Sequence, residues 1–282
     1  MPETPFTEYC GHMYRLLQRL HDFIMGAVAP GIDSQLAHRP ESARKRANAI
    51  QVTFVRIFRW LKTLDKLNQT HDVQAVGAAA RGVFELYLDL RWFEKFPEPE
   101  YLERFCAFPD VTMYMAAKKV VEHKRQNPTS SVNSDPQQSF MDRMDKPEPM
   151  SAKVSRLWGV DQKGKPLWPR DHWAGKGKLP QRTKLLGLDC EDAYVQIYSI
   201  LCGLIHPGAS PEVRQSLSDF EWLEKQMGYA LFHVYMHARA STILACDLLG
   251  AREQIAGFDR GLRQLDAYLD DAARSLPGFG QS

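Results

Sequence analysis

One stretch of the sequence decides the fold: Ala78-Ala-Ala-Arg81-Gly-Val-Phe-Glu85-Leu-Tyr-Leu-Asp89-Leu-Arg91-Trp92-Phe93. At about 100° per residue, its large apolar side chains cover nearly the whole circumference of a helix. Such a helix must be packed on most sides, so we expect it to be central to the fold. Arg81, Glu85 and Asp89 are spaced four residues apart and form a polar stripe along it.

The charges in this helix need partners, because burying an unpaired charge is costly. Arg81 and Glu85 are one helical turn apart and within reach of an ion pair. The pair is either a structural contact that fixes how neighbouring helices dock, or part of a binding or catalytic site.

The rest of the chain has the same helical periodicity, and no stretch alternates like a strand. The sequence therefore predicts an all-α fold, with residues 1–282 forming a single multi-helix bundle of about seven or eight helices. Residues 127–182 are predicted to be a largely irregular insertion rich in Trp and Lys. Pro30 is expected to end the first helix, and Pro109 to kink or break a later one.

The composition limits the classes of protein to which the chain can belong. Its 282 residues are 44% hydrophobic, enough for a sizeable core. A net charge of +2 means that any anion-binding site must be local. Scattered cysteines without a Cys-x2-Cys pair argue against a disulfide framework and indicate a reducing cytoplasm. The sequence has neither a signal-peptide pattern nor an apolar run near the roughly 20 residues of a membrane span, so we expect no membrane association.

A second polar stripe precedes Pro207. Its members fall at alternating steps of four and three residues and line one narrow sector of a helix: Asp192, Gln196, Ser199, Gly203 and His206. His206, at the end of that helix, is suited either to general acid–base chemistry or to capping its own helix carbonyls. Tyr194 and Tyr198 border the stripe, as hydroxyl donors or as core aromatics.

The insertion alternates cations and aromatic rings. Rings beside phosphate-binding cations are typical of single-stranded nucleic acid sites, and these residues fit that pattern: Trp168, His172, Trp173, Lys176 and Lys178. The alternative is a surface loop that its tryptophans pin onto the helices.

His233 and His237 stand one helical turn apart, a spacing that could hold a metal ion. The Glu of His-Glu-x2-His is missing and no third ligand is evident, so we expect a packed or solvated histidine pair, with no metal and no cofactor.

Three motifs together resemble a known family: Ala-Arg81-x2-Phe-Glu85, His172-Trp-Ala-Gly175 and Tyr198-x7-His206-Pro-Gly. Over roughly residues 50 to 210 the chain is similar to an all-helical bacterial family of unknown function, which has an Arg-x3-Glu helix, a His-Trp-Ser-Gly-like element and a late helix ending in His. The resemblance implies that Arg81, Glu85, His172 and His206 form one polar site, and it implies no activity. Ala174 stands where the family has Ser, which leaves a hydroxyl role there without support.

More distantly, the chain resembles HEPN helical domains, many of which are metal-independent ribonucleases in toxin and antiphage systems with an Arg-x4–6-His motif. Only Arg15-x5-His21 has this spacing here, a match expected by chance. The likeness would instead require Arg81 and His206 to meet in space.

The first hypothesis for function is a cytoplasmic protein that binds or cleaves RNA, or another phosphate-containing ligand, without a metal ion. In a ribonuclease mechanism, His206 would be general acid or base, Arg81 would stabilise the phosphorane charge, and Glu85 would orient Arg81. The insertion would deliver His172. The expected ligand-binding residues are Tyr198, Ser199, Trp173, Lys176 and Lys178.

Two alternatives stay open. One is a non-enzymatic helical interaction module, as a homodimer, in which the Arg81–Glu85 pair is structural. The other is a small-molecule enzyme with a pocket among Tyr198, Ser199 and His233.

Overall fold

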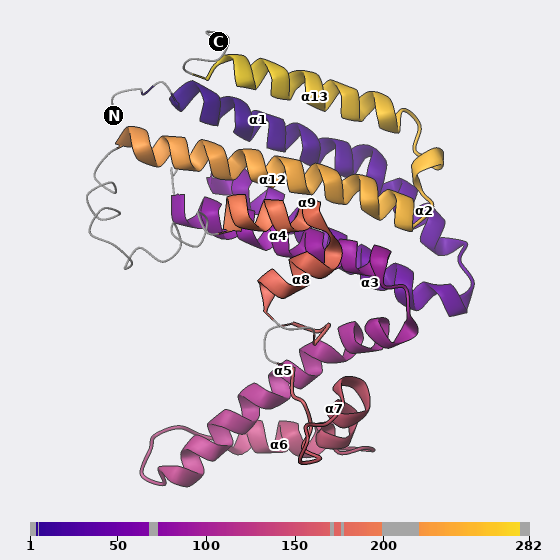
Figure 1. Ribbon diagram of the computed structural model, residues 1–282, viewed down its shortest axis with the longest axis vertical. Helices are drawn as coiled ribbons and strands as arrows, with labels where there is room; N and C mark the ends of the chain where they lie inside the picture. The colour runs from indigo at the N-terminus through magenta and orange to yellow at the C-terminus, as the bar shows by residue number, and fades with distance from the viewer. Residues whose placement is uncertain are drawn as a thin grey trace. The chain divides into compact units, whose positions relative to one another are not determined.

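The computed structural model describes residues 4, 6–67, 73–169, 172–175, 178–198 and 220–276. Within these ranges every regular element is a helix (Figure 1), and strand-like pairing is limited to one isolated bridge between Val160 and Pro166. The all-α prediction is therefore confirmed. None of the described helices combines the length and the apolar character that crossing a bilayer requires.

The chain divides into two compact units. The first is formed by Met1–Lys95 together with Leu186–Ser282, and the second by Phe96–Leu185. The sequence predicts one domain with an insertion at residues 127–182. The second unit contains the whole of this segment and also the long helix Pro99–Gln126 that precedes it.

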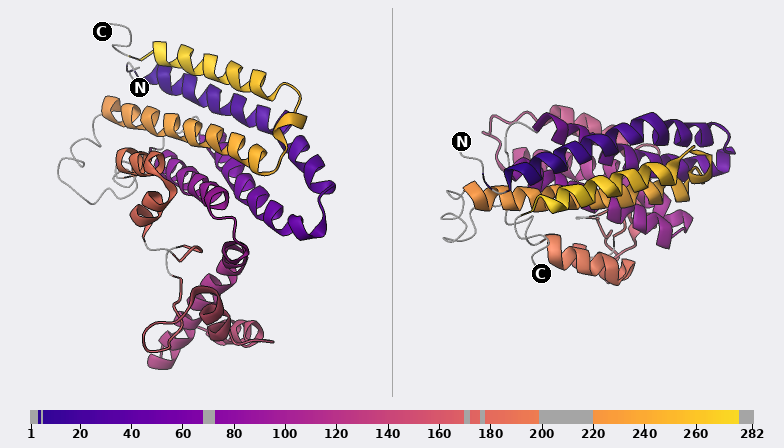
Figure 2. Two further views of the ribbon diagram at one scale, coloured as in Figure 1. Left: turned by 45° about the vertical axis from the view of Figure 1, so that its right-hand side comes forward. Right: turned by 90° about the horizontal axis from the view of Figure 1, so that it is seen from above.

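The first unit consists of long helices joined by short ones. In Figures 1 and 2, α1, α12 and α13 run side by side, and α4 packs against both α3 and α12. The α-helices of this unit are α1 (Thr7–Phe23), α2 (Ala29–Ala37), α3 (Glu41–Leu67), α4 (Val73–Lys95), α9 (Leu188–Ala193), α12 (Phe220–Leu248) and α13 (Phe258–Arg274). Two π-helical turns, η1 (Ile24–Val28) and η2 (Tyr194–Tyr198), and the 3₁₀ turn η3 (Arg252–Gln254) complete it.

Helix α4 is the central helix that the sequence predicts. Its apolar side chains are buried around most of its circumference, among them Val83, Phe84 and Trp92. Gly82 allows α3 to approach closely, because a Cβ atom there would lie 2.6 Å from Nε1 of Trp60. The helix is therefore closely packed where it meets α3.

The N-terminal segment differs from the prediction at Pro30. The helical path does not end there but continues through η1 into α2, where Pro30 occupies the first turn. Proline is tolerated at that position because the first N–H groups of a helix have no intrahelical partner. Together with short helices in the insertion, this division raises the helix count somewhat above the seven or eight expected.

The second unit has a small core of its own. Its helices are α5 (Pro99–Gln126), α6 (Asp135–Met144), α7 (Met150–Trp158) and α8 (Leu179–Leu186). The last residue of α8, Leu186, is assigned to the first unit. Pro109 lies inside α5 without ending it. Residues of α5 and α7 form the core, including Val111, Val154 and Trp158. The segment 127–182 is thus more helical than its composition suggests.

Candidate functional site

Arg81 and Glu85 form the ion pair that their spacing predicts. The Nε atom of Arg81 lies 2.9 Å from Oε1 of Glu85. Their side chains are 35% and 40% exposed. An exposed pair of this kind adds little to stability. The pair lies at the boundary between the core and solvent, where a ligand can reach it.

Tyr198 joins this pair from η2. Its hydroxyl group donates a hydrogen bond of 3.2 Å to Oε1 of Glu85. The guanidinium carbon of Arg81 lies 4.9 Å from the centre of the Tyr198 ring, within the range of a cation–π contact. We call Arg81, Glu85 and Tyr198 the Arg81 cluster. The guanidinium is held at one edge by a carboxylate and over one face by a ring.

The π-helical turn η2 contacts two helices, α4 through Tyr198 and α12 through Gln196. Tyr194 and Tyr198 stack on each other, with ring centres 5.1 Å apart. The hydroxyl group of Tyr229 in α12 donates a hydrogen bond of 3.1 Å to the carbonyl oxygen of Gln196. Single π-helical turns of this kind are common at functional sites. This turn positions Tyr198 against α4.

Two histidines of α12 lie near Phe84, the buried His237 in contact with it and the partly buried His233 one turn away. The ring of His237 makes an edge contact with Phe84 at 5.0 Å, and its Nδ1–H donates to the carbonyl oxygen of His233 at 2.8 Å. Burial lowers the pKa of both histidines to about 4, so both are neutral at pH 7. The described residues contain no group of three His, Cys, Asp or Glu side chains arranged to hold a metal ion.

A second arginine of α4, Arg91, has partners that were not predicted from the sequence. Arg91 lies 2.7 Å from Asp189 of α9 and 3.0 Å from Glu94, and it donates a hydrogen bond to the Tyr87 hydroxyl. Two carboxylates compensate its charge, so Arg91 ties α9 to α4. The acidic residue Asp189 at the start of α9 was the only hint of this contact in the sequence. Helical periodicity cannot predict a contact between residues 98 positions apart.

The His172-Trp-Ala-Gly175 motif forms a tight turn in the second unit. The His172 ring accepts a hydrogen bond of 3.1 Å from the backbone N–H of Ala174 through Nδ1. Trp173 is only 3% exposed, and its carbonyl oxygen accepts a bond of 2.8 Å from the Trp158 indole. Gly175 has a φ of 65°, and a Cβ atom there would lie 2.6 Å from Trp158. The motif packs the loop onto α7.

The structure brings together three of the predicted site residues, Arg81, Glu85 and Tyr198. Trp173 is too deeply buried to offer a face to a ligand, so we assign it a packing role. Lys178 is exposed and belongs to the second unit, as does His172. Ser199, His206 and Lys176, also predicted for the site, lie outside the described residues.

The fold and the site define a class of protein: an all-helical protein with a partly exposed Arg–Glu–Tyr cluster on its central helix. The chain belongs to the Family of unknown function (DUF5677), which matches residues 47–221 and so includes α4 and η2. This membership confirms the resemblance to a helical family of unknown function and lends no support to the likeness to HEPN domains. No curated protein and no solved structure matches the chain.

Proposed function

We propose that the Arg81 cluster binds a phosphate group of RNA, and that it does so through side chains rather than through a metal ion. One observation carries the proposal: the guanidinium of Arg81 is oriented by Glu85 and Tyr198 while about a third of its side chain is exposed. An arginine fixed in advance loses less side-chain entropy when it binds phosphate. Its planar donors match the oxygens of a phosphate group.

The cluster supports binding more directly than cleavage. Cleavage needs a group that exchanges protons at the reacting atoms. His237 is neutral at pH 7 but only 7% exposed, which leaves little of its ring for a substrate. The sequence assigns the proton-transfer role to His206, and the mechanism with His206 as general acid or base stays a prediction. Comparing the ribonuclease activity of the wild type with that of His206→Ala tests it.

The binding proposal is tested with a fluorescently labelled single-stranded RNA at several salt concentrations. We expect Arg81→Gln to weaken binding by about tenfold and to lower the slope of log affinity against log salt by roughly one, because one phosphate contact is lost. Arg59→Gln is the matched control, since this exposed arginine of α3 has no ion pair among the described residues. Equal affinities for Arg81→Gln and wild type would contradict the proposal.

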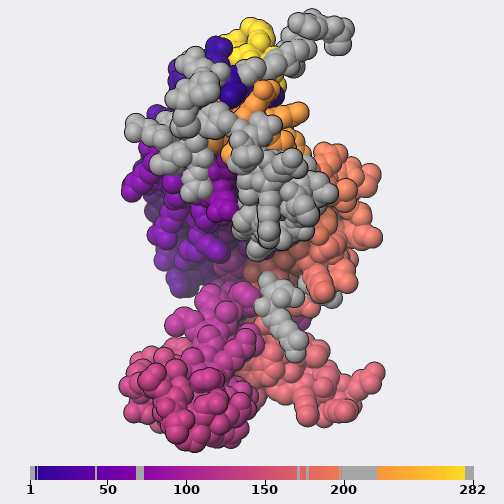
Figure 3. Space-filling model, turned by 90° about the vertical axis from the view of Figure 1, so that its left-hand side faces the viewer, coloured from indigo at the N-terminus to yellow at the C-terminus, as the bar shows by residue number. Residues whose placement is uncertain are grey.

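A second candidate function is a helical interaction module in which the Arg81–Glu85 pair is structural. It is favoured by two exposed apolar side chains of α9 and η2, a segment that lies at the surface in Figure 3. Leu188 is 71% exposed and Val195 63%. They are seven residues apart, about two helical turns, and share a face. In this case sedimentation velocity would reveal concentration-dependent self-association that Leu188→Glu abolishes, and Arg81→Gln would leave RNA affinity unchanged.

A further inference from the structure

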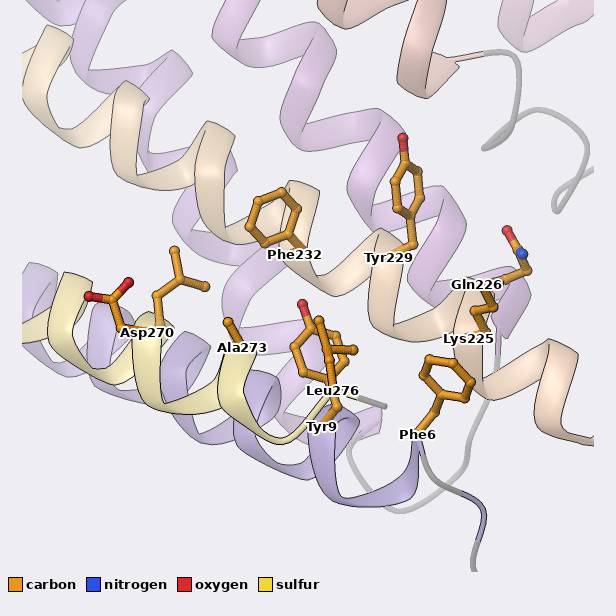
Figure 4. Close-up of a pocket in the computed structure, with 10 residues that line it drawn as sticks. Phe6, Tyr9, Lys225, Gln226, Tyr229, Phe232, Asp270, Ala273 and Leu276 are labelled. Atoms are coloured by element: carbon orange, nitrogen blue, oxygen red, sulfur yellow. The ribbon is translucent and has the colours of Figure 1, made fainter. Parts of the chain in front are cut away.

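A groove separate from the Arg81 cluster lies between the start of α1, the first half of α12 and the end of α13 (Figure 4). Its volume is about 610 Å³. This lies within the range of small-molecule sites, about 300 to 1,000 Å³. Its walls are large aromatic and aliphatic side chains: Phe6, Tyr9, Tyr229, Phe232, Leu269 and Leu276.

Ala273 is the smallest of the side chains that line the groove, and it leaves room between the larger ones. A second copy of the same concave surface would not fill it, since two hollows placed face to face leave a void whose lining atoms lose their contacts. An elongated apolar molecule would bury the exposed parts of the walls. The shape therefore favours a ligand over self-association.

Polar groups mark the two ends of the groove. Lys225 and Gln226 lie at one end and Asp270 at the other (Figure 4). Within the described residues, neither Lys225 nor Asp270 takes part in an ion pair. The Tyr9 hydroxyl also borders the groove and is protonated at neutral pH, because burial raises the pKa of Tyr9 to about 12. The Lys225 end of the groove therefore carries an ammonium group and an amide, which are both hydrogen-bond donors.

We propose that this groove binds an amphiphile with a single carboxylate head group and an apolar chain of medium length. The head group lies against Lys225 and Gln226, where an ammonium and an amide donate to its oxygens. The chain runs along the aromatic walls toward Ala273 and Leu269. Asp270 repels the head group from the far end and so fixes the direction of binding. This site is independent of the proposed RNA site.

Isothermal titration of the full chain with decanoate, below its critical micelle concentration, tests the proposal. We expect saturable binding that Ala273→Phe abolishes, because the added ring fills the groove. Lys225→Ala should weaken decanoate roughly three- to tenfold and leave decanol, which has no charge, unaffected. Lys62→Ala, at an exposed lysine of α3, is the matched control and should bind decanoate like the wild type.

Three results would overturn the inference. The first is decylammonium binding more tightly than decanoate, which would place the head group at Asp270. The second is decanoate binding that Ala273→Phe leaves unchanged, which would place the ligand elsewhere. The third is self-association that Ala273→Phe prevents, with no decanoate binding by the wild type, which would make the groove an interface between copies. The comparison of decanoate with decylammonium uses the wild-type protein alone. It therefore still decides the question if one of the variants is unstable.

Discussion

Tyr198 and Glu85, 113 positions apart in the chain, are joined by a hydrogen bond of 3.2 Å from the tyrosine hydroxyl to the carboxylate. The same carboxylate oxygen receives the Nε–H of Arg81, so one atom of Glu85 connects η2 with the cation of α4. Replacing Tyr198 therefore alters both the docking of η2 and the orientation of Arg81, and the two effects can be measured separately.

Tyr198→Phe keeps the ring over Arg81 and removes the hydrogen bond to Glu85. We expect it to lower the free energy of urea unfolding by about 0.5 to 1.5 kcal/mol. Tyr194→Phe is the control, because the stacked Tyr194 makes no hydroxyl hydrogen bond within the described residues, and it should change stability by less than about 0.5 kcal/mol. If both variants lose the same stability, the Tyr198–Glu85 bond contributes nothing specific.

Stability should fall as the solution is acidified through the range in which the buried histidines titrate. Burial lowers the pKa of His237 from 6.5 to about 4, so the unfolded state binds more protons between these two values. The contribution is complete above pH 6.5 and is lost as the pH falls toward 4, at no more than about 1.4 kcal/mol per pH unit for each histidine. Urea unfolding at a series of pH values measures this slope.

His237→Phe should flatten that dependence, because the ring contact with Phe84 is retained and one titrating group is removed. His38→Phe, at an exposed position of the first unit, should leave the slope as it is in the wild type. A wild-type slope in His237→Phe would show that the acid sensitivity originates elsewhere.

The close approach of α3 and α4 at Gly82 makes this glycine hard to replace. In Gly82→Ala the new methyl group would lie 2.6 Å from the Trp60 indole, and we expect a loss of about 1 to 3 kcal/mol despite the better helix propensity of alanine. In Gly11→Ala the nearest atom is 3.5 Å away, at the end of the flexible Arg15 side chain. That variant should gain about 0.5 to 1 kcal/mol. Opposite signs in thermal unfolding are the expected result.

Gly175 and Gly164 separate backbone strain from steric conflict in the second unit. Both have positive φ, 65° and 72°, so alanine at either costs about 1 kcal/mol for its backbone conformation. Only at Gly175 would the Cβ atom also meet Trp158; at Gly164 nothing lies within 4 Å. We expect Gly175→Ala to be the more destabilising of the two by at least about 1 kcal/mol in urea unfolding. Equal losses would mean that Trp158 moves aside freely.

The two polar stripes differ in how much of their role could be predicted. The Arg81–Glu85 pair follows from a four-residue spacing and was predictable, because contacts one turn apart depend only on helix geometry. The role of Tyr198 was not, since the sequence gives no measure of which helix η2 faces. For the same reason the contact between the Tyr198 hydroxyl group and Glu85 was not predicted, and ligand binding by Tyr198 stays a prediction.

The insertion contains more helix than its composition alone suggests, for a different physical reason. Its abundant Pro, Ser and Asn favour loops, yet α6 and α7 form because their apolar side chains pack against α5 and compensate for weak intrinsic propensity. Trp173 illustrates the same effect at one residue. Its neighbours in sequence are basic and suggest a nucleic acid platform, while its neighbours in space bury it.

The sequence by itself determined the helical class of this protein, the central position of α4 and the Arg81–Glu85 pair. These properties depend on periodicity and on contacts one turn apart, which the order of residues specifies directly. Only the tertiary structure decided that Tyr198 completes the Arg81 cluster, that Trp173 is buried, and that α1, α12 and α13 enclose an apolar groove. Those features depend on which helix faces pack together across long separations, and packing is settled by the shapes of all the contacting side chains at once.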